Sequence, residues 1–254
     1  MNVYEEVQVF YESYCGEKRV IGKSVEGRDL FAMHIGAKSG VQGIAQYAIH
    51  GREWITSLIA LAHIRRGLSR GGIWVLPLTN PDGAILSESG LRPLWKANAR
   101  GVDLNVNFDA RWGSGVSNVR QKSSENYIGE RPFSEPETQA LRDFTLEINP
   151  AFTVSFHTKG EEIYYEFHQP LVRKLRDRRL AQALSSSTGY PLVTIKNSAG
   201  GYKDWCIQEL KIPAFTVEVG SDELTHPIGR STFPALLTDV LDALVALTSA
   251  VKDQ

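Results

Sequence analysis

Residues 44–66 read IAQYAIHGREWITSLIALAHIRR, and this stretch decides the fold class. Its first part, 44–49, is a short apolar run typical of a buried strand. Its last part, 54–66, repeats apolar residues at helical spacing, and the polar segment His50-Gly51-Arg52-Glu53 joins the two. A strand followed at once by a helix is the repeating unit of an α/β protein.

The same alternation of strand and helix recurs along the chain. Further strands are expected at 73–78, 151–156 and 214–219, with a hairpin at 19–23 and 29–35. Helices are expected at 4–14, 134–148, 170–187 and 233–251, whereas 111–131 shows no period and reads as a functional loop. Together these patterns predict one α/β/α domain over residues 1–254, with helices packed on a mixed, largely parallel central sheet.

The composition narrows the possible partners. Lys and Arg number 28 and Asp and Glu number 29, so the net charge of −1 offers no basic surface for nucleic acid. Two cysteines are too few for a disulfide scaffold. The first residues, MNVYEEVQVF, show no secretory signal, and the apolar segment 240–251 is too short to span a membrane. We therefore expect a cytoplasmic monomer without a membrane or nucleic-acid partner.

Three polar residues at predicted strand ends are candidates for a metal site. His50 ends one strand, and Glu53 lies three residues later in the first helical turn, so both side chains can face one cation. His157 ends the strand 151–156, and ligands gather at the carboxyl ends of strands in α/β sheets. Zinc accepts His nitrogen and carboxylate oxygen, although a capped helix start and an ordinary strand-end histidine explain the same residues.

Glu218 is a fourth candidate, because it lies within the apolar strand 214–219. A buried carboxylate without a partner is costly. Either a basic side chain neutralises Glu218, or the carboxylate serves a site.

At this point the sequence resembles the carboxypeptidase A-type zinc metallopeptidases. The resemblance rests on seven short motifs that occur in the family's order: His50-Gly51-Arg52-Glu53-Trp54, Asn80-Pro81-Asp82-Gly83, Trp95-Lys96 leading to Gly101-Val102-Asp103-Leu104-Asn105, Ser134-Glu135-Pro136-Glu137-Thr138, Ser155-Phe156-His157, Asp204-Trp205, and Phe215-Thr216-Val217-Glu218. It implies a zinc carboxypeptidase-like fold over most of the chain.

The resemblance also implies a mechanism. One zinc ion per chain would be bound by His50, Glu53 and His157, and Asp103 would orient His50. Zinc would activate a water, and Glu218 would act as general base and then protonate the leaving amine.

A cation is expected to stabilise the oxyanion of the reaction. The family has Arg at the position after the motif tryptophan, whereas this chain has Lys96 there, with Arg100 near enough to substitute. Surface charges exposed to solvent are the alternative explanation of both residues.

The chain departs from the family where carboxypeptidases bind a terminal carboxylate. It keeps Asn105 but has Val106 in place of the family's Arg, so a bidentate clamp is missing. At two positions that cap the substrate and line the specificity pocket in the family, the chain has Lys196 and Lys203. Cations there suit a substrate with extra carboxylates.

These departures resemble the branch that cleaves γ-D-glutamyl-diamino acid bonds of cell-wall muropeptides. Carboxylates of such a substrate would meet basic side chains, namely Arg52, Lys159, Lys196 and Lys203, with Asn105 nearby. Its ammonium group would meet an acidic one, namely Glu161, Glu162 or Glu166. The alternatives are an ordinary metallocarboxypeptidase, a deacylase of N-acyl amino acids, and a muropeptide-binding module without activity.

Overall fold

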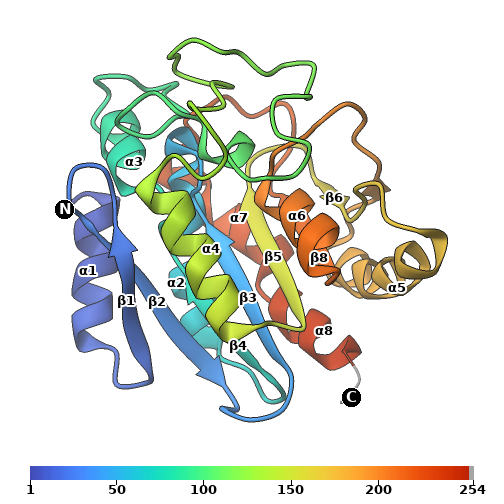
Figure 1. The fold of residues 1–254 in the computed structure, drawn as a ribbon. Helices are drawn as coiled ribbons and strands as arrows, with labels where there is room; N and C mark the ends of the chain where they lie inside the picture. Colours follow the sequence, from blue (N-terminus) through green and yellow to red (C-terminus); the bar gives the residue numbers. More distant parts are fainter. Residues whose placement is uncertain (252–254) are drawn as a thin grey trace.

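A mixed β-sheet forms the centre of the molecule (Figure 1). The computed structural model describes residues 1–251, and within them the strands assemble into one eight-stranded sheet. In spatial order the strands are β1 (Lys18–Lys23), β2 (Asp29–Gly36), β4 (Gly72–Leu76), β3 (Gln42–Tyr47), β5 (Phe152–His157), β8 (Ala214–Glu218), β6 (Glu162–Tyr164) and β7 (Leu192–Val193). β3, β4, β5 and β8 run parallel to one another, whereas β2 joins β4 and β6 joins β8 antiparallel.

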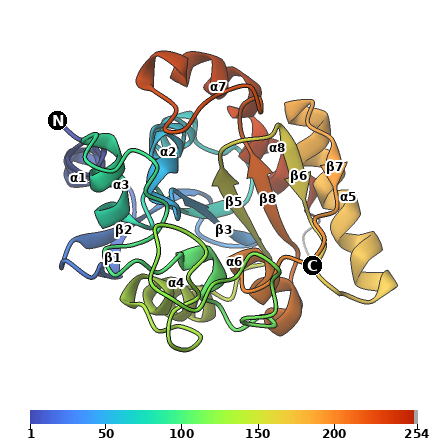
Figure 2. The ribbon, with the colours of Figure 1, turned by 90° about the horizontal axis from the view of Figure 1, so that it is seen from above.

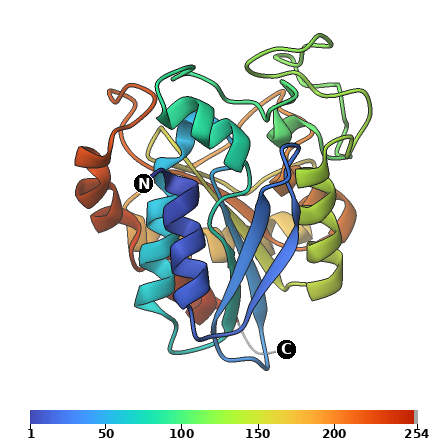
Figure 3. The ribbon, with the colours of Figure 1, turned by 90° about the vertical axis from the view of Figure 1, so that its left-hand side faces the viewer.

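Helices cover both faces of the sheet. They are α1 (Val3–Ser13), α2 (Ile55–Arg66), α3 (Pro81–Glu88), α4 (Pro136–Ile148), α5 (Leu171–Thr188), α6 (Tyr202–Trp205), α7 (Phe233–Val240) and α8 (Ala243–Ala250). Figure 3 shows α1 and α2 on one face and α4 on the other. The predicted α/β/α architecture is therefore confirmed.

Alternating side chains of the central strands fill two cores. On β4, Ile73 and Val75 pack into the core beneath α1, α2, α7 and α8, whereas Trp74 and Leu76 pack into the core beneath α4 and α6. Successive side chains of a strand point to opposite faces, so a strand with both faces covered is apolar throughout. This is why the central strands are continuous apolar runs instead of alternating patterns.

The prediction of one continuous helix over 233–251 is wrong in one respect, because the helix is interrupted at residues 241–242, between α7 and α8. The stretch Arg230–Ala250 has a mean hydropathy of 1.5 and is long enough to cross a membrane as a helix. Core helices of soluble proteins can have the same length and hydropathy. Its apolar residues Leu236, Val240, Leu244 and Leu247 are buried in the first core. This side of the stretch therefore packs as part of the core.

The site region lies where the parallel strands end. Loops between residues 89 and 135 extend above the carboxyl ends of β3 and β5, at the top of Figure 1, and Figure 2 shows them from above. The aperiodic segment 111–131 is part of this cover, and its Tyr127 carbonyl accepts a hydrogen bond from the Asp103 N–H at 2.9 Å. The loop is thus packed onto a predicted site residue.

Candidate zinc site

Two neighbouring parallel strands bring the predicted ligands together. Tyr47 of β3 lies opposite Phe156 of β5, so His50 and His157 emerge side by side just beyond. A 3₁₀ turn, Gly51–Glu53, then folds Glu53 back over His50. Gly51 is required here, because a Cβ at this position would lie 2.5 Å from the backbone of Gly83.

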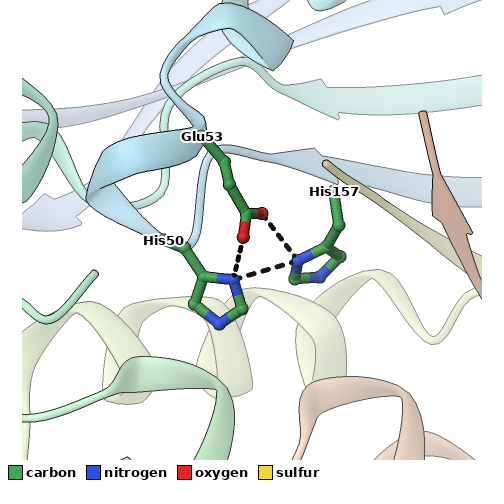
Figure 4. Close-up of side chains that lie close together, drawn as sticks. All are labelled: His50, Glu53 and His157. Carbon is green, nitrogen blue, oxygen red and sulfur yellow. Dashed lines mark hydrogen bonds and ion pairs between the residues drawn. The ribbon is translucent and has the colours of Figure 1, made fainter. Parts of the chain in front are cut away.

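The three side chains converge on one point (Figure 4). Nδ1 of His50 lies 2.8 Å from Oε1 of Glu53, and Nδ1 of His157 lies 2.9 Å from Oε2 of the same carboxylate. The two Nδ1 atoms are 3.1 Å apart. All three residues are buried, with at most 6% of their surface exposed.

This donor set fits zinc. Two imidazole nitrogens and a carboxylate are common ligands of catalytic zinc, which keeps a further position for water. Both imidazoles direct Nδ1 at the same buried carboxylate, and the His157 Nε2 atom has no hydrogen-bond partner among residues 1–251. Zinc bound here supplies a Lewis acid that activates water at neutral pH.

A buried ion pair supports His50 from behind. Asp103 Oδ1 lies 3.3 Å from His50 Nε2, and Asp103 Oδ2 lies 2.8 Å from Lys96 Nζ. Burial by itself raises the pKa of Asp103, but Lys96 and His50 outweigh it and hold the pKa well below its usual range. A charged Asp103 fixes the orientation of the His50 ring, as carboxylates behind metal-bound histidines do.

Glu218 lies beside the ligands, at the carboxyl end of β8. It is the register partner of His157 on the adjacent parallel strand, so the two side chains leave the same face about 5 Å apart. Burial raises the pKa of Glu218 to about 7. Within residues 1–251 no lysine or arginine forms an ion pair with Glu218, so the basic-partner explanation of this carboxylate does not apply there.

The two oxyanion candidates lie in different places. Lys96 is mostly buried and contacts Asp103 in the cluster. Arg100 is half-exposed, and its guanidinium lies 3.7 Å from Glu135 on the outer side of the same segment. The structure thus brings Lys96, and not Arg100, to the zinc ligands.

Three of the expected substrate-binding residues have polar partners within the protein. Nη1 of Arg52 lies 3.1 Å from Glu125, whose side chain is 45% exposed. Nζ of Lys159 lies 3.3 Å from the carboxylate of Asp222, which is 79% exposed. The Asn105 side chain accepts a hydrogen bond from the Tyr202 N–H at 3.1 Å, so its oxygen already has a backbone partner.

The other two lysines behave differently. Lys196 is exposed. Lys203 is buried, and its Nζ contacts Asp204 Oδ1 at 2.6 Å and the Glu166 carbonyl at 2.9 Å. The charge of Lys203 is therefore already balanced inside the protein.

Several residues of the site region carry no signal in the local sequence. Thr158 donates its N–H to Glu53 Oε2 at 3.4 Å, and His226 contacts Thr158 from a loop 68 residues away. Glu125 and Asp222 approach the site from loops of their own. No local pattern identifies such residues, because only the folded chain brings them near the ligands.

Comparisons with known proteins agree with this site. Residues 13–234 match the zinc carboxypeptidase family. The chain is 31% identical to gamma-D-glutamyl-L-diamino acid endopeptidase 1 of Lysinibacillus sphaericus, across 97% of this chain and 70% of that protein. It is 34% identical to murein peptide amidase A of Escherichia coli K12, across 81% of this chain and 83% of that protein.

The fold agrees as well. The structure superposes on thrombin activatable fibrinolysis inhibitor with a TM-score of 0.84 at 22% identity, across 98% of this chain and 76% of that one. At this identity the likeness concerns the fold alone. Fold, ligand cluster and family match together show that the chain belongs to the zinc carboxypeptidase family, as a zinc metallopeptidase whose single zinc ion is held by His50, Glu53 and His157.

Proposed function

We propose that this zinc peptidase hydrolyses the bond between the γ-carboxyl of D-glutamate and a diamino acid in cell-wall muropeptides. The observation that carries the proposal is the pair of relatives named for such substrates, each at least 31% identical over most of this chain. The charges around the zinc ligands support it independently.

In this proposal the chain's own residues move one proton. Glu218 accepts the proton of the attacking water at its carboxylate and delivers it to the amine that leaves. The pKa of about 7 suits both steps, because a group is most effective when its pKa lies near the working pH. Lys96, whose ammonium lies 2.8 Å from the Asp103 carboxylate that contacts His50, supplies the positive charge that stabilises the negative oxygen of the intermediate.

The anionic groups of the substrate need cations, because Val106 cannot provide a carboxylate clamp. Arg52 and Lys159 are suited to this role. Their present partners are exposed carboxylates, and exposed ion pairs contribute only about 0–1 kcal/mol, so a substrate carboxylate can replace them. Lys203 is less suited, because both members of its pair with Asp204 are buried.

The ammonium group of the diamino acid needs an anion, and Glu162 is better suited to this role than Glu166. It lies directly opposite Glu218 in the antiparallel pair of β6 with β8. Like charges in this arrangement repel each other, and within residues 1–251 no lysine or arginine pairs with Glu162. Its Oε2 is held by the Tyr164 hydroxyl at 2.6 Å, whereas Glu166 is already paired with Lys174.

The test uses zinc-loaded protein with L-Ala-γ-D-Glu-diaminopimelate, and mass spectrometry identifies the products. The α-linked isomer of the peptide and a hippuryl amino acid are the control substrates, and Glu218→Gln is the control variant. We expect diaminopimelate to be released from the γ-linked peptide alone, and the variant to release none.

Other results would identify the alternatives. Cleavage of the hippuryl substrate alone would mean an ordinary carboxypeptidase. Cleavage of N-acyl amino acids, with both peptides intact, would mean a deacylase. A cytoplasmic location and a monomeric state remain predictions, which cell fractionation and analytical ultracentrifugation would check.

A further inference from the structure

The loop that follows Glu218 is attached to the segment that follows His157. The Gly160 N–H donates to the Gly220 carbonyl at 2.7 Å, and the Lys159 ammonium donates to the Asp222 carbonyl at 2.5 Å. Both contacts join the two segments beside the zinc ligands. The Val219 N–H also donates to the carbonyl of the ligand His157 at 2.8 Å, and His226 contacts the next residue, Thr158.

One nitrogen of His226 contacts two oxygen atoms of Thr158. Its Nε2 lies 3.0 Å from the Thr158 hydroxyl and 3.1 Å from the Thr158 carbonyl oxygen. A carbonyl only accepts hydrogen bonds, so this geometry requires a proton on Nε2. His226 therefore acts as a donor to the backbone of the residue that follows a zinc ligand.

Thr158 transmits this constraint to the zinc site. It is 3% exposed, and its N–H points at Oε2 of Glu53, 3.4 Å away. The same oxygen faces Nδ1 of His157 at 2.9 Å. The backbone conformation of Thr158 connects the carbonyl that His226 holds with the N–H that faces Glu53. It thus affects the orientation of the Glu53 carboxylate towards the position where the zinc ligands converge.

We infer that His226 is a positioning residue for the zinc site, because its Nε2–H fixes the carbonyl of Thr158, the residue whose N–H in turn orients the Glu53 carboxylate. The inference does not depend on the proposed substrate. It concerns the affinity for zinc, which partners of metal ligands typically change by about 10- to 100-fold when they are removed.

The experiment measures the zinc dissociation constant of the full-length protein by competition with a chromophoric chelator. His226→Leu removes the donor and keeps a side chain of similar size, whereas His226→Gln keeps an amide N–H near the position of Nε2. Thr158→Val removes only the hydroxyl, and His168→Leu is the matched control at an exposed loop histidine. Thermal unfolding of each metal-free variant reports on folding.

We expect His226→Leu to raise the zinc dissociation constant at least tenfold, and His226→Gln and Thr158→Val to stay within about threefold of the original protein. The absorption spectrum of the cobalt-substituted protein should change in His226→Leu alone. An unchanged dissociation constant in His226→Leu, or an equal loss in His168→Leu, would overturn the inference. If His226→Leu does not fold, the His226→Gln variant decides. A tenfold rise in its zinc dissociation constant would also overturn the inference, because glutamine retains an N–H donor at this position.

Discussion

Breaking the pair of Lys96 with Asp103 should weaken both the fold and the zinc site. The two charges lie 2.8 Å apart, and the Asp103 side chain is fully buried. At an effective dielectric constant of about 20 their attraction is roughly 6 kcal/mol, part of which offsets the cost of removing both charges from water. We expect Asp103→Asn to reduce the free energy of unfolding of the metal-free protein by about 3 kcal/mol, because it leaves the Lys96 charge without its partner.

A double-mutant cycle tests this reasoning. Asp103→Asn, Lys96→Met and the double variant are unfolded in urea without metal, with Arg100→Met as a control at a half-exposed cation. The double variant should lose at least about 1.5 kcal/mol less than the sum of the single losses, since the pair is then removed as a unit. Losses that add to within about 0.5 kcal/mol would refute the pairing.

The same variants separate two roles of Lys96. Asp103→Asn should weaken zinc binding by about 10- to 100-fold, because His50 loses its orienting carboxylate. Lys96→Met should keep the zinc affinity within about threefold of the original protein, because the contact of Asp103 with His50 remains. If Lys96 stabilises the oxyanion, the same variant should have a kcat reduced by roughly 100- to 1000-fold at saturating zinc. Unchanged kcat in Lys96→Met would leave Lys96 with the structural role alone.

Four further outcomes are expected. Glu218→Gln should lower kcat by about 10²- to 10⁴-fold with zinc affinity within about threefold, whereas an equal loss of zinc would mean that Glu218 is a ligand. Glu162→Gln should lower kcat/KM about tenfold or more for the diaminopimelate peptide. It should leave kcat/KM unchanged for a 2-aminopimelate analogue, which lacks the second amine. Equal effects on both substrates would exclude an ammonium site at Glu162. Burial lowers the pKa of His63 from 6.5, its value in the unfolded chain, to about 4 in the folded protein. Between pH 6.5 and pH 4 the unfolded chain therefore binds a proton at His63 that the folded protein does not bind. As a result, the free energy of unfolding falls as the pH drops from 6.5 to 4. Relative to His63→Gln, the original protein should lose about 3 kcal/mol over that range in urea unfolding, and parallel pH profiles would contradict this. Removal of zinc with a chelator should lower the melting temperature of the original protein and leave that of His157→Ala unchanged, and equal shifts would show a metal bound elsewhere.

Local sequence identified the zinc ligands as candidates, and the resemblance to the zinc carboxypeptidases assigned them to the metal. His50 and His157 each follow an apolar run typical of a buried strand, and buried parallel strands end at one edge of the sheet. Glu53 follows His50 by three residues, so a single turn brings the two together whatever the rest of the chain does. Such arguments need only the spacing of residues and the direction of strands.

Short and interrupted elements could not be predicted in this way. β6 and β7 have three and two residues, too few for a period to appear, and the break between α7 and α8 lies within one apolar stretch. Their conformation is determined by the elements against which they pack. The antiparallel placement of Glu162 opposite Glu218 depends on β6 and was therefore invisible in the sequence.

The sequence by itself determined the α/β fold class and the strand ends at which the candidate zinc ligands lie, because strand ends and helical turns are set by local periodicity and by the burial of apolar side chains. The order of its motifs added the resemblance that assigned those candidates to zinc. Only the tertiary structure decided the state of each charge around them. In the folded protein, Lys203 is paired with Asp204, and Arg100 lies near Glu135. His226 contacts Thr158. These contacts join residues from separate loops, and the energy of a charge or a hydrogen bond depends on neighbours in space, which spacing along the chain does not encode.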